Sequence, residues 1–204
     1  MPDTLRRVEL VDADLPNASG AARLLLEDFA DALCAYARMG KSEVPTVAWA
    51  DSASSPADDT DALVAAFTVQ GATLPDRAID MLDAIAAHPV PLYALCATDS
   101  HDPADALAAL DELDRRCADA GIPWRGGVIV GGGALIARTA KSPRMGTLRR
   151  WRSEATDALI AAVRLGASVE KAAQITRDTT RVRKGNIILA RCPIPNAAYR
   201  LLCR

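Results

Sequence analysis

The chain has 204 residues, of which 50% are hydrophobic and 25% charged, as is usual for a globular protein with one sizeable core. Its formal net charge of -2 provides no general attraction to nucleic acid or to an anionic membrane surface. No apolar run approaches the roughly 20 residues that cross a bilayer, and the first residues lack the apolar stretch of a secretory signal. We therefore expect a cytoplasmic protein that binds neither nucleic acid nor membrane.

Apolar runs alternate with amphipathic segments from the first residues to about residue 166, which predicts alternating strands and helices. The apolar runs contain few polar residues, as expected for parallel strands covered on both faces. The predicted strands are residues 7–13, 44–49, 62–67, 90–97 and 126–131. The predicted helices follow the first strand (ending near Gly40), the third, the fourth and the fifth, the last of these with Ser153 as its N-cap.

The segment from Val90 to Gly133 predicts a strand, a crossover helix and a second strand. Leu107, Leu110, Leu113 and Cys117 are three or four residues apart, so they share one helical face, and we expect them to be buried together. Gly131, Gly132 and Gly133 follow the second strand. We interpret them as a tight exit from the sheet, with irregular structure over residues 134–147, because a dinucleotide fingerprint requires a helix that opens directly on the glycines.

These elements predict an α/β fold, a doubly wound sheet of five parallel strands in the order 2-1-3-4-5 between two helix layers. We expect residues 1–166 to form this domain and residues 167–204 to be a C-terminal extension packed on it, with an extended segment near 187–195. Ligands of such sheets bind beyond the carboxyl ends of the strands. That rule selects the loops at residues 14–21, 68–73 and 97–102.

Five cysteines are spread along the chain without the C-x-x-C spacing typical of metal sites (Cys34, Cys96, Cys117, Cys192 and Cys203). We expect free thiols in a reducing compartment and no metal site. Cys96 lies inside an apolar run, which favours a core position over a nucleophile.

Three segments in this order resemble flavodoxin-like NAD(P)H-dependent FMN reductases, in particular a divergent bacterial branch. They are VELVDADLPNASGAARLLL, DALVAAFTVQGATLPDRAIDMLDAI and PLYALCATDSHDPADALAALDELDRRCADAGIPWRGGVIVGGG. The resemblance covers roughly residues 7 to 165. It implies a flavodoxin-like three-layer fold, FMN as cofactor, NAD(P)H as co-substrate and a small acceptor such as a quinone or free flavin. It leaves open a homodimer.

The resemblance also implies which residues bind the cofactor, and no catalytic side chain, since hydride transfer through a flavin requires none. The FMN phosphate would lie at Asn17, Ser19, Gly20 and Ala21. The flavin ring would lie between two further loops, formed by Thr68, Val69, Gln70 and Gly71 on one side and by Thr98, Asp99, Ser100 and His101 on the other.

Each of these loops has a simpler interpretation that stays open. Ser19 has the right place to cap the following helix, and residues 68–73 suit a plain strand-to-helix turn. His101 is an acid or base candidate because its pKa lies near neutrality, but a loop histidine before a helix is usually solvated.

The sequence departs from the family pattern at two places. Asp14-Leu15-Pro16 replaces a Gly-Ser-Pro start, and Thr68-Val69-Gln70 replaces an aromatic pair. A carboxylate at Asp14 would repel a phosphate unless it points away. The alternative is therefore a flavodoxin-like protein that has lost FMN and serves as a binding or assembly module. A third hypothesis, an electron carrier with FMN and no NAD(P)H site, suits the near-neutral charge less well.

Between residues 138 and 152 the chain has six positively charged side chains and no acidic one (Arg138, Lys141, Arg144, Arg149, Arg150 and Arg152). They form either a clamp for the phosphates of NADPH or another anionic substrate, or a solvated loop that balances acidic helices elsewhere.

Overall fold

The computed structural model describes residues 5–14 and 20–202, and these form one seven-stranded sheet in the order β2-β1-β3-β4-β5-β7-β6. All neighbouring strands in it are parallel except β6 and β7, which are antiparallel. The strands are β1 (Arg7–Asp12), β2 (Thr46–Ala50), β3 (Ala62–Val69), β4 (Leu92–Thr98), β5 (Trp124–Gly131), β6 (Arg183–Lys184) and β7 (Ile187–Ala190).

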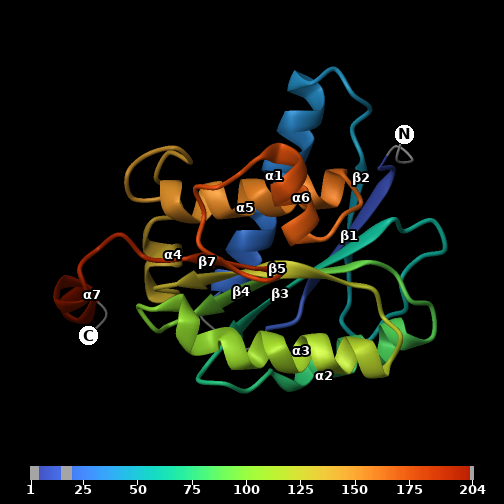
Figure 1. The fold of residues 1–204 in the computed structure, drawn as a ribbon, viewed down its shortest axis with the longest axis horizontal. Coiled ribbons are helices and arrows are strands. Elements are labelled where there is room, and N and C mark those ends of the chain that lie inside the picture. The colour runs from blue at the N-terminus through green and yellow to red at the C-terminus, as the bar shows by residue number, and fades with distance from the viewer. Residues whose placement is uncertain (1–4, 15–19, 203–204) are drawn as a thin grey trace.

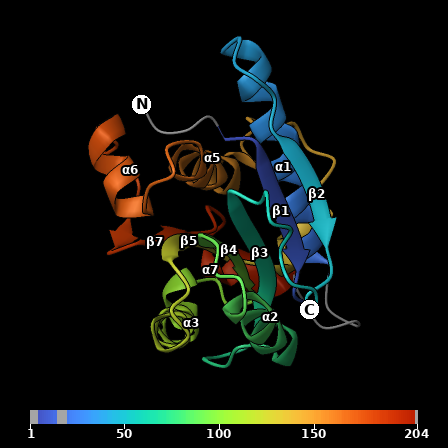
Figure 2. The ribbon, with the colours of Figure 1, turned by 90° about the vertical axis from the view of Figure 1, so that its right-hand side faces the viewer.

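Helices cover both faces of the sheet (Figures 1 and 2). They are α1 (Ala21–Met39), α2 (Asp76–Ala86), α3 (Leu107–Asp119), α4 (Ala134–Arg138), α5 (Arg150–Arg164), α6 (Val169–Thr176) and α7 (Asn196–Leu202), with a 3₁₀ turn, η1 (Pro103–Ala106), before α3. One core lies between the sheet and α1, α5 and α6, and the other between the sheet and α2 and α3. Along β3, Val64 faces the first core and Ala65 the second, which explains the continuous apolar run.

The α/β fold class and the strand order 2-1-3-4-5 are confirmed for the first five strands. The predicted number of five strands is wrong, because residues 167–204 add two more. β7 pairs with the outer edge of β5, and the paired residues run from Gly127 with Ile187 to Val130 with Ala190. This pairing satisfies backbone groups that β5 would otherwise expose at the edge of the sheet. The sequence indicated an extended segment here, but not the strand with which it pairs.

Helix α3 buries the predicted face almost completely. Leu110, Leu113 and Cys117 have no exposed surface, whereas Leu107, the first residue of the helix, is only partly buried. The preceding turn η1 is capped by Asp102, whose side chain accepts a hydrogen bond from the Ala104 amide at 3.1 Å.

Two predictions for the segment after β5 are wrong. Helix α4 begins at Ala134, directly after the three glycines, since the Leu135 and Ile136 amides bond to the carbonyls of Gly132 and Gly133. Helix α5 begins at Arg150, so Ser153 is fully buried inside it and does not cap it. Its start is set by a turn in which the Arg149 and Arg150 amides bond to the Gly146 carbonyl, at 3.0 and 2.9 Å.

Candidate functional site

The carboxyl ends of β1, β3 and β4 meet at one edge of the sheet, as the strand order requires, and α1 begins there at Ala21. Gly20 is exposed and Ala21 is buried, and the first turn of α1 contains no acidic residue. Two expected phosphate-binding residues, Asn17 and Ser19, lie outside the described residues. The positive end of the α1 dipole therefore lies at this edge, and no acidic side chain in the first turn of α1 neutralises it.

Asp14 links the ends of β1 and β3. Its carboxylate accepts hydrogen bonds from the Thr68 amide at 3.2 Å and from the Thr68 hydroxyl at 2.8 Å, and it is only 6% exposed. The carboxylate points into the protein, and both donors of Thr68 are directed to it. Thr68 was predicted to face a flavin, and the sequence offered no signal for this partner 54 residues away.

The loop after β3 presents backbone more than side chains. Val69 is fully buried in the core beside α2, so its side chain does not line the edge as predicted. Gln70 and Gly71 are exposed, and Gln70 pairs with Thr73 across a tight turn. Gly71 has φ +74°, and a Cβ added there would meet nothing within 4 Å. The turn therefore requires glycine and leaves its backbone accessible from the edge.

The loop after β4 uses most of its polar groups internally. Thr98 is 3% exposed, and its hydroxyl accepts a hydrogen bond from the Ser100 amide at 3.3 Å. The Ser100 hydroxyl donates to Asp105. Asp99 is exposed and Ser100 half-buried, and the Asp99 carboxylate lies beside Gly133, where an added Cβ would be 2.9 Å from its Oδ1.

His101 is half-buried, which contradicts the expectation of a solvated loop histidine. Its Nε2 lies 2.6 Å from the Ile194 carbonyl oxygen, and its ring centroid lies 5.7 Å from that of Tyr199. A carbonyl only accepts hydrogen bonds, so Nε2 carries the proton and donates. His101 thus binds the C-terminal segment through Nε2.

The three glycines after β5 pack directly against the β4 loop. The Gly132 amide donates to the Ser100 carbonyl at 2.7 Å, and the Gly133 amide to the Thr98 carbonyl at 2.8 Å. A Cβ on Gly131 would lie 2.7 Å from the His101 carbonyl oxygen, so no larger residue fits. These glycines permit close approach of two backbone segments, which accounts for them without a dinucleotide.

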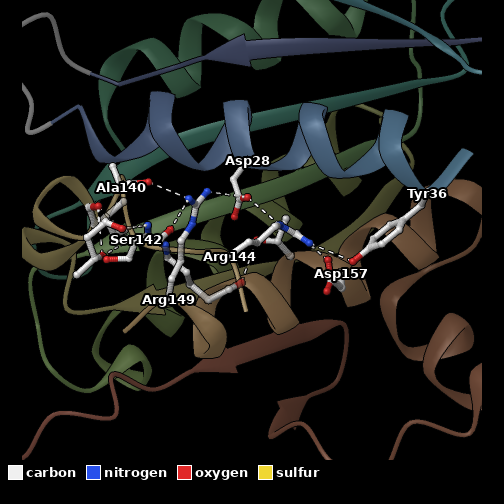
Figure 3. A network of polar contacts seen from close by, with 11 residues as sticks. Asp28, Tyr36, Ala140, Ser142, Arg144, Arg149 and Asp157 are labelled. Atoms are coloured by element: carbon white, nitrogen blue, oxygen red, sulfur yellow. Dashed lines mark hydrogen bonds and ion pairs between the residues drawn. The ribbon is translucent and has the colours of Figure 1, made fainter. Parts of the chain in front are cut away.

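Two arginines of the basic segment, Arg144 and Arg149, bind side chains of α1 and α5 (Figure 3). Asp28 of α1 is buried and accepts hydrogen bonds from Arg144 and Arg149, each at 2.8 Å. Arg144 also donates to Asp157 at 2.6 Å and to the Tyr36 hydroxyl at 3.0 Å. Burial lowers the pKa of Arg144, but its hydrogen bonds to Asp157 and Asp28 outweigh this effect and raise the pKa above its ordinary value.

Arg152 is also buried, and it donates to the Ile136 carbonyl and the Thr139 hydroxyl at 3.0 and 2.9 Å. Arg144, Arg149 and Arg152 thus attach the segment after α4 to α1 and α5. This arrangement favours a structural role over a clamp for NADPH. The alternative prediction, that the segment is a solvated loop, is also wrong for these three residues. Lys141 and Arg150 are exposed.

Cys96 has no exposed surface, which confirms its core position. Burial, together with the nearby charge of Asp14, raises the pKa of its thiol. A thiol of this kind remains protonated near neutrality and is a poor nucleophile.

A cavity of about 440 Å³ lies between α5, α6 and the segment before β6. Arg181 and Arg183 line it, and both bind the Asp178 carboxylate, at 2.5 and 2.8 Å. Their charge is therefore partly neutralised within the protein. Among the predicted cofactor-binding residues that the structure describes, none lines this cavity.

FMN requires hydrogen-bond donors for its phosphate and a close, flat approach for its ring. The described residues fit this group through backbone more than through side chains, with the start of α1 for the phosphate and the open turn at Gly71 for the ring. The side-chain donors are fewer than the sequence suggested, because the donors of Thr68 are directed to Asp14.

In the part of the chain that the structure describes, no helix is both long and apolar enough to cross a membrane.

No protein-family model and no curated protein sequence matches the chain. Among solved structures, an oxidoreductase from Corynebacterium diphtheriae is similar, with a TM-score of 0.53 and 16% identity over 86% of this chain and 100% of that chain. A short-chain flavodoxin associated with a non-canonical PDU bacterial microcompartment has a TM-score of 0.44 and 12% identity, over 67% of this chain and 95% of that chain. At such identities, similarity is informative about the fold alone. The similarity to the oxidoreductase structure, together with the strand order 2-1-3-4-5, shows that the chain has a flavodoxin-like α/β fold.

Proposed function

We propose that this protein binds FMN at the carboxyl edge of β1, β3 and β4 and acts as an NAD(P)H-dependent oxidoreductase with a small acceptor, such as a quinone or free flavin. The observation that carries the proposal is the meeting of three elements at this edge, the start of α1, the open turn at Gly71 and the loop after β4. In sheets of this strand order, ligands bind where the direction of chain progression reverses.

The phosphate would be held by backbone amides at Gly20 and Ala21, with Asn17 and Ser19 as the side-chain donors. The ring would lie between Gln70 and Gly71 on one side and Thr98 to His101 on the other, with Val69 and Thr68 supporting the turn from inside. When bound, FMN supplies the hydride chemistry, while the chain binds and orients it. The Asp14 carboxylate is buried and bonded to Thr68 at this edge, where it adds negative charge, so we expect FMN to bind weakly for this fold.

The second candidate is a flavodoxin-like binding or assembly module without FMN. The specific observation in its favour is the buried Asp14 carboxylate, which takes both donors of Thr68, a residue expected to face the flavin.

The deciding experiment is titration of the apo-protein with FMN and with riboflavin, which lacks the phosphate. If the start of α1 is a phosphate site, FMN binds more tightly than riboflavin and Ser19→Ala removes much of the difference. Each lost charge-assisted hydrogen bond is worth about 1.5–3 kcal/mol, or roughly tenfold to a hundredfold in affinity. Thr179→Ala, at an exposed position on the cavity between α5 and α6, is the control and should leave both affinities unchanged. If neither flavin binds at high micromolar concentration, the second candidate stands.

If FMN binds, its reduction by NADH and by NADPH under anaerobic conditions tests the enzymatic part of the proposal. Bleaching of the flavin absorbance by either nucleotide supports an NAD(P)H-dependent enzyme. Retained colour with both nucleotides would favour an electron carrier instead.

A further inference from the structure

The C-terminal segment after β7 continues past the carboxyl ends of β4, β5 and β7 and ends in α7 (Figure 1). We call residues 191–202 the strap. In the view of Figure 2, α7 projects behind β4, so both views place it beyond the carboxyl ends of the central strands and not on either helix layer. The strap thus reaches the edge at which we place the flavin.

Polar contacts join the strap to the loop after β4. The Tyr199 hydroxyl donates to the Asp99 carbonyl at 2.7 Å, and His101 donates to the Ile194 carbonyl at 2.6 Å. Arg191 forms an ion pair with Asp102 at 2.6 Å. Three residues of the strap, Arg191, Ile194 and Tyr199, therefore contact one four-residue stretch of the loop.

Apolar packing holds the strap in place. Tyr199 is 6% exposed and Cys192 is 3% exposed, and they form a small cluster with Leu135 of α4, separate from the two main cores. A Cβ on Gly132 would lie 3.1 Å from the Cys192 Cβ and 3.4 Å from the Tyr199 ring, so the strap also lies closely against the glycines after β5. Helix α7 has seven residues and would be only marginally stable without such packing.

The hydrogen bond from Tyr199 determines how the Asp99–Ser100 peptide is turned. The Asp99 carbonyl accepts from the tyrosine hydroxyl, while the Ser100 carbonyl accepts from the Gly132 amide. These two bonds fix the carbonyls of Asp99 and Ser100, and Asp99 itself remains exposed. The loop's conformation is therefore held by the strap as well as by β5.

The geometry points to Tyr199 as a positioning residue, which holds the loop after β4 in the conformation that contacts the flavin ring. This role rests on the proposed function. The contacts described above attach the strap to the β4 and β5 side of the edge, so the strap forms a wall of the site. A loop that is already ordered loses less conformational freedom when a ligand binds, and so it binds the ligand more tightly.

The test is Tyr199→Phe, which removes the hydroxyl and keeps the ring in its apolar cluster. Tyr36→Phe is the matched control, because the Tyr36 hydroxyl contacts Arg144 in the network beside α1. We expect Tyr199→Phe to weaken both FMN and riboflavin by about threefold to tenfold, the range for one neutral hydrogen bond. The ratio of the two affinities should stay as in the wild type, because the strap contacts the ring side and not the phosphate side.

Hydrogen exchange at residues 99–102 provides a readout that does not depend on flavin. Their amides should exchange faster in Tyr199→Phe than in the wild type or in Tyr36→Phe, at a melting temperature close to that of the wild type. Unchanged exchange overturns the positioning role, as does an affinity loss confined to FMN or an affinity equal to that of the wild type. If the wild type binds neither flavin, the proposed function fails and the role in flavin binding fails with it, whereas unaltered flavin binding by Tyr199→Phe refutes the positioning role alone.

Discussion

The carboxylate of Asp14 at the end of β1 accepts the amide and the hydroxyl of Thr68 at the end of β3, at 3.2 and 2.8 Å. This pair ties together two neighbouring strand ends at the place where the chain's progression across the sheet reverses. It also takes both donors of a residue that was expected to face the flavin ring, and it adds a negative charge near the proposed phosphate site. The pair is therefore a feature of the described residues that weakens the proposed FMN binding.

Asp14→Asn should strengthen FMN binding. The amide oxygen can still accept from the Thr68 amide, so the local structure is retained while one negative charge is removed. Two unit charges several ångströms apart at an effective dielectric of about 20 repel by roughly 2 kcal/mol, so we expect about a thirtyfold gain for FMN and little change for riboflavin. Asp58→Asn removes an exposed charge before β3 and serves as the control. Equal gains for the two flavins in a titration would show that Asp14 does not act on a phosphate.

Asp28→Ala should destabilise the protein strongly, because it leaves Arg144 and Arg149 without their shared buried carboxylate. Removing one partner from a buried ion pair costs about 3–5 kcal/mol. Asp157→Ala is the comparison, since Asp157 is more exposed and binds only Arg144 of the two, and we expect a loss of about 1 kcal/mol there. Denaturant unfolding measures both values. Similar losses for the two variants would contradict the central place of Asp28 in the network of Figure 3.

Leu110→Ala should cost about 2–5 kcal/mol in the free energy of unfolding, as a truncation in a closely packed core. Leu110 has no exposed surface and packs between α3 and the sheet, whereas Leu148 is 53% exposed. Leu148→Ala should therefore change the free energy by a few tenths of a kcal/mol. A loss below about 1 kcal/mol for Leu110→Ala would mean that the core under α3 closes around the smaller side chain.

Asp178 should stabilise the protein above about pH 4 and lose this effect in acid. Burial raises the pKa of Asp178, but hydrogen bonds from Arg181, Thr180 and Arg183 outweigh it and lower the pKa below the ordinary value of 3.8. A carboxyl whose pKa is lower in the folded state contributes stability above its unfolded pKa, and the contribution disappears as the pH falls through the folded pKa. Asp178→Asn should thus be less stable than the wild type at pH 6, and the gap should narrow below about pH 4. A gap that is constant between pH 6 and pH 2 in denaturant unfolding would refute this coupling.

The sequence alone determined the fold class, the first five strands and the order in which they pair. Each strand or helix is encoded in a short stretch, because the hydrophobic period depends only on neighbouring residues. Successive right-handed crossovers then restrict how parallel strands are arranged. The burial of Leu110, Leu113 and Cys117 followed from their spacing on one helical face. The core position of Cys96 followed from the apolar run in which it lies.

The tertiary structure decided the contacts at the proposed site. Thr68 and Asp14 are separated by 54 residues, Tyr199 and Asp99 by 100, and Arg144 and Asp28 by 116. The pairing of β7 with β5, which adds the C-terminal residues to the sheet, also joins residues that are far apart in the sequence. Local periodicity contains no information about which distant polar group a threonine, tyrosine or arginine will meet. Those partners are set only when the packed strands and helices bring the ends of their loops together, because a buried polar group must then be satisfied by whichever donor or acceptor lies within reach.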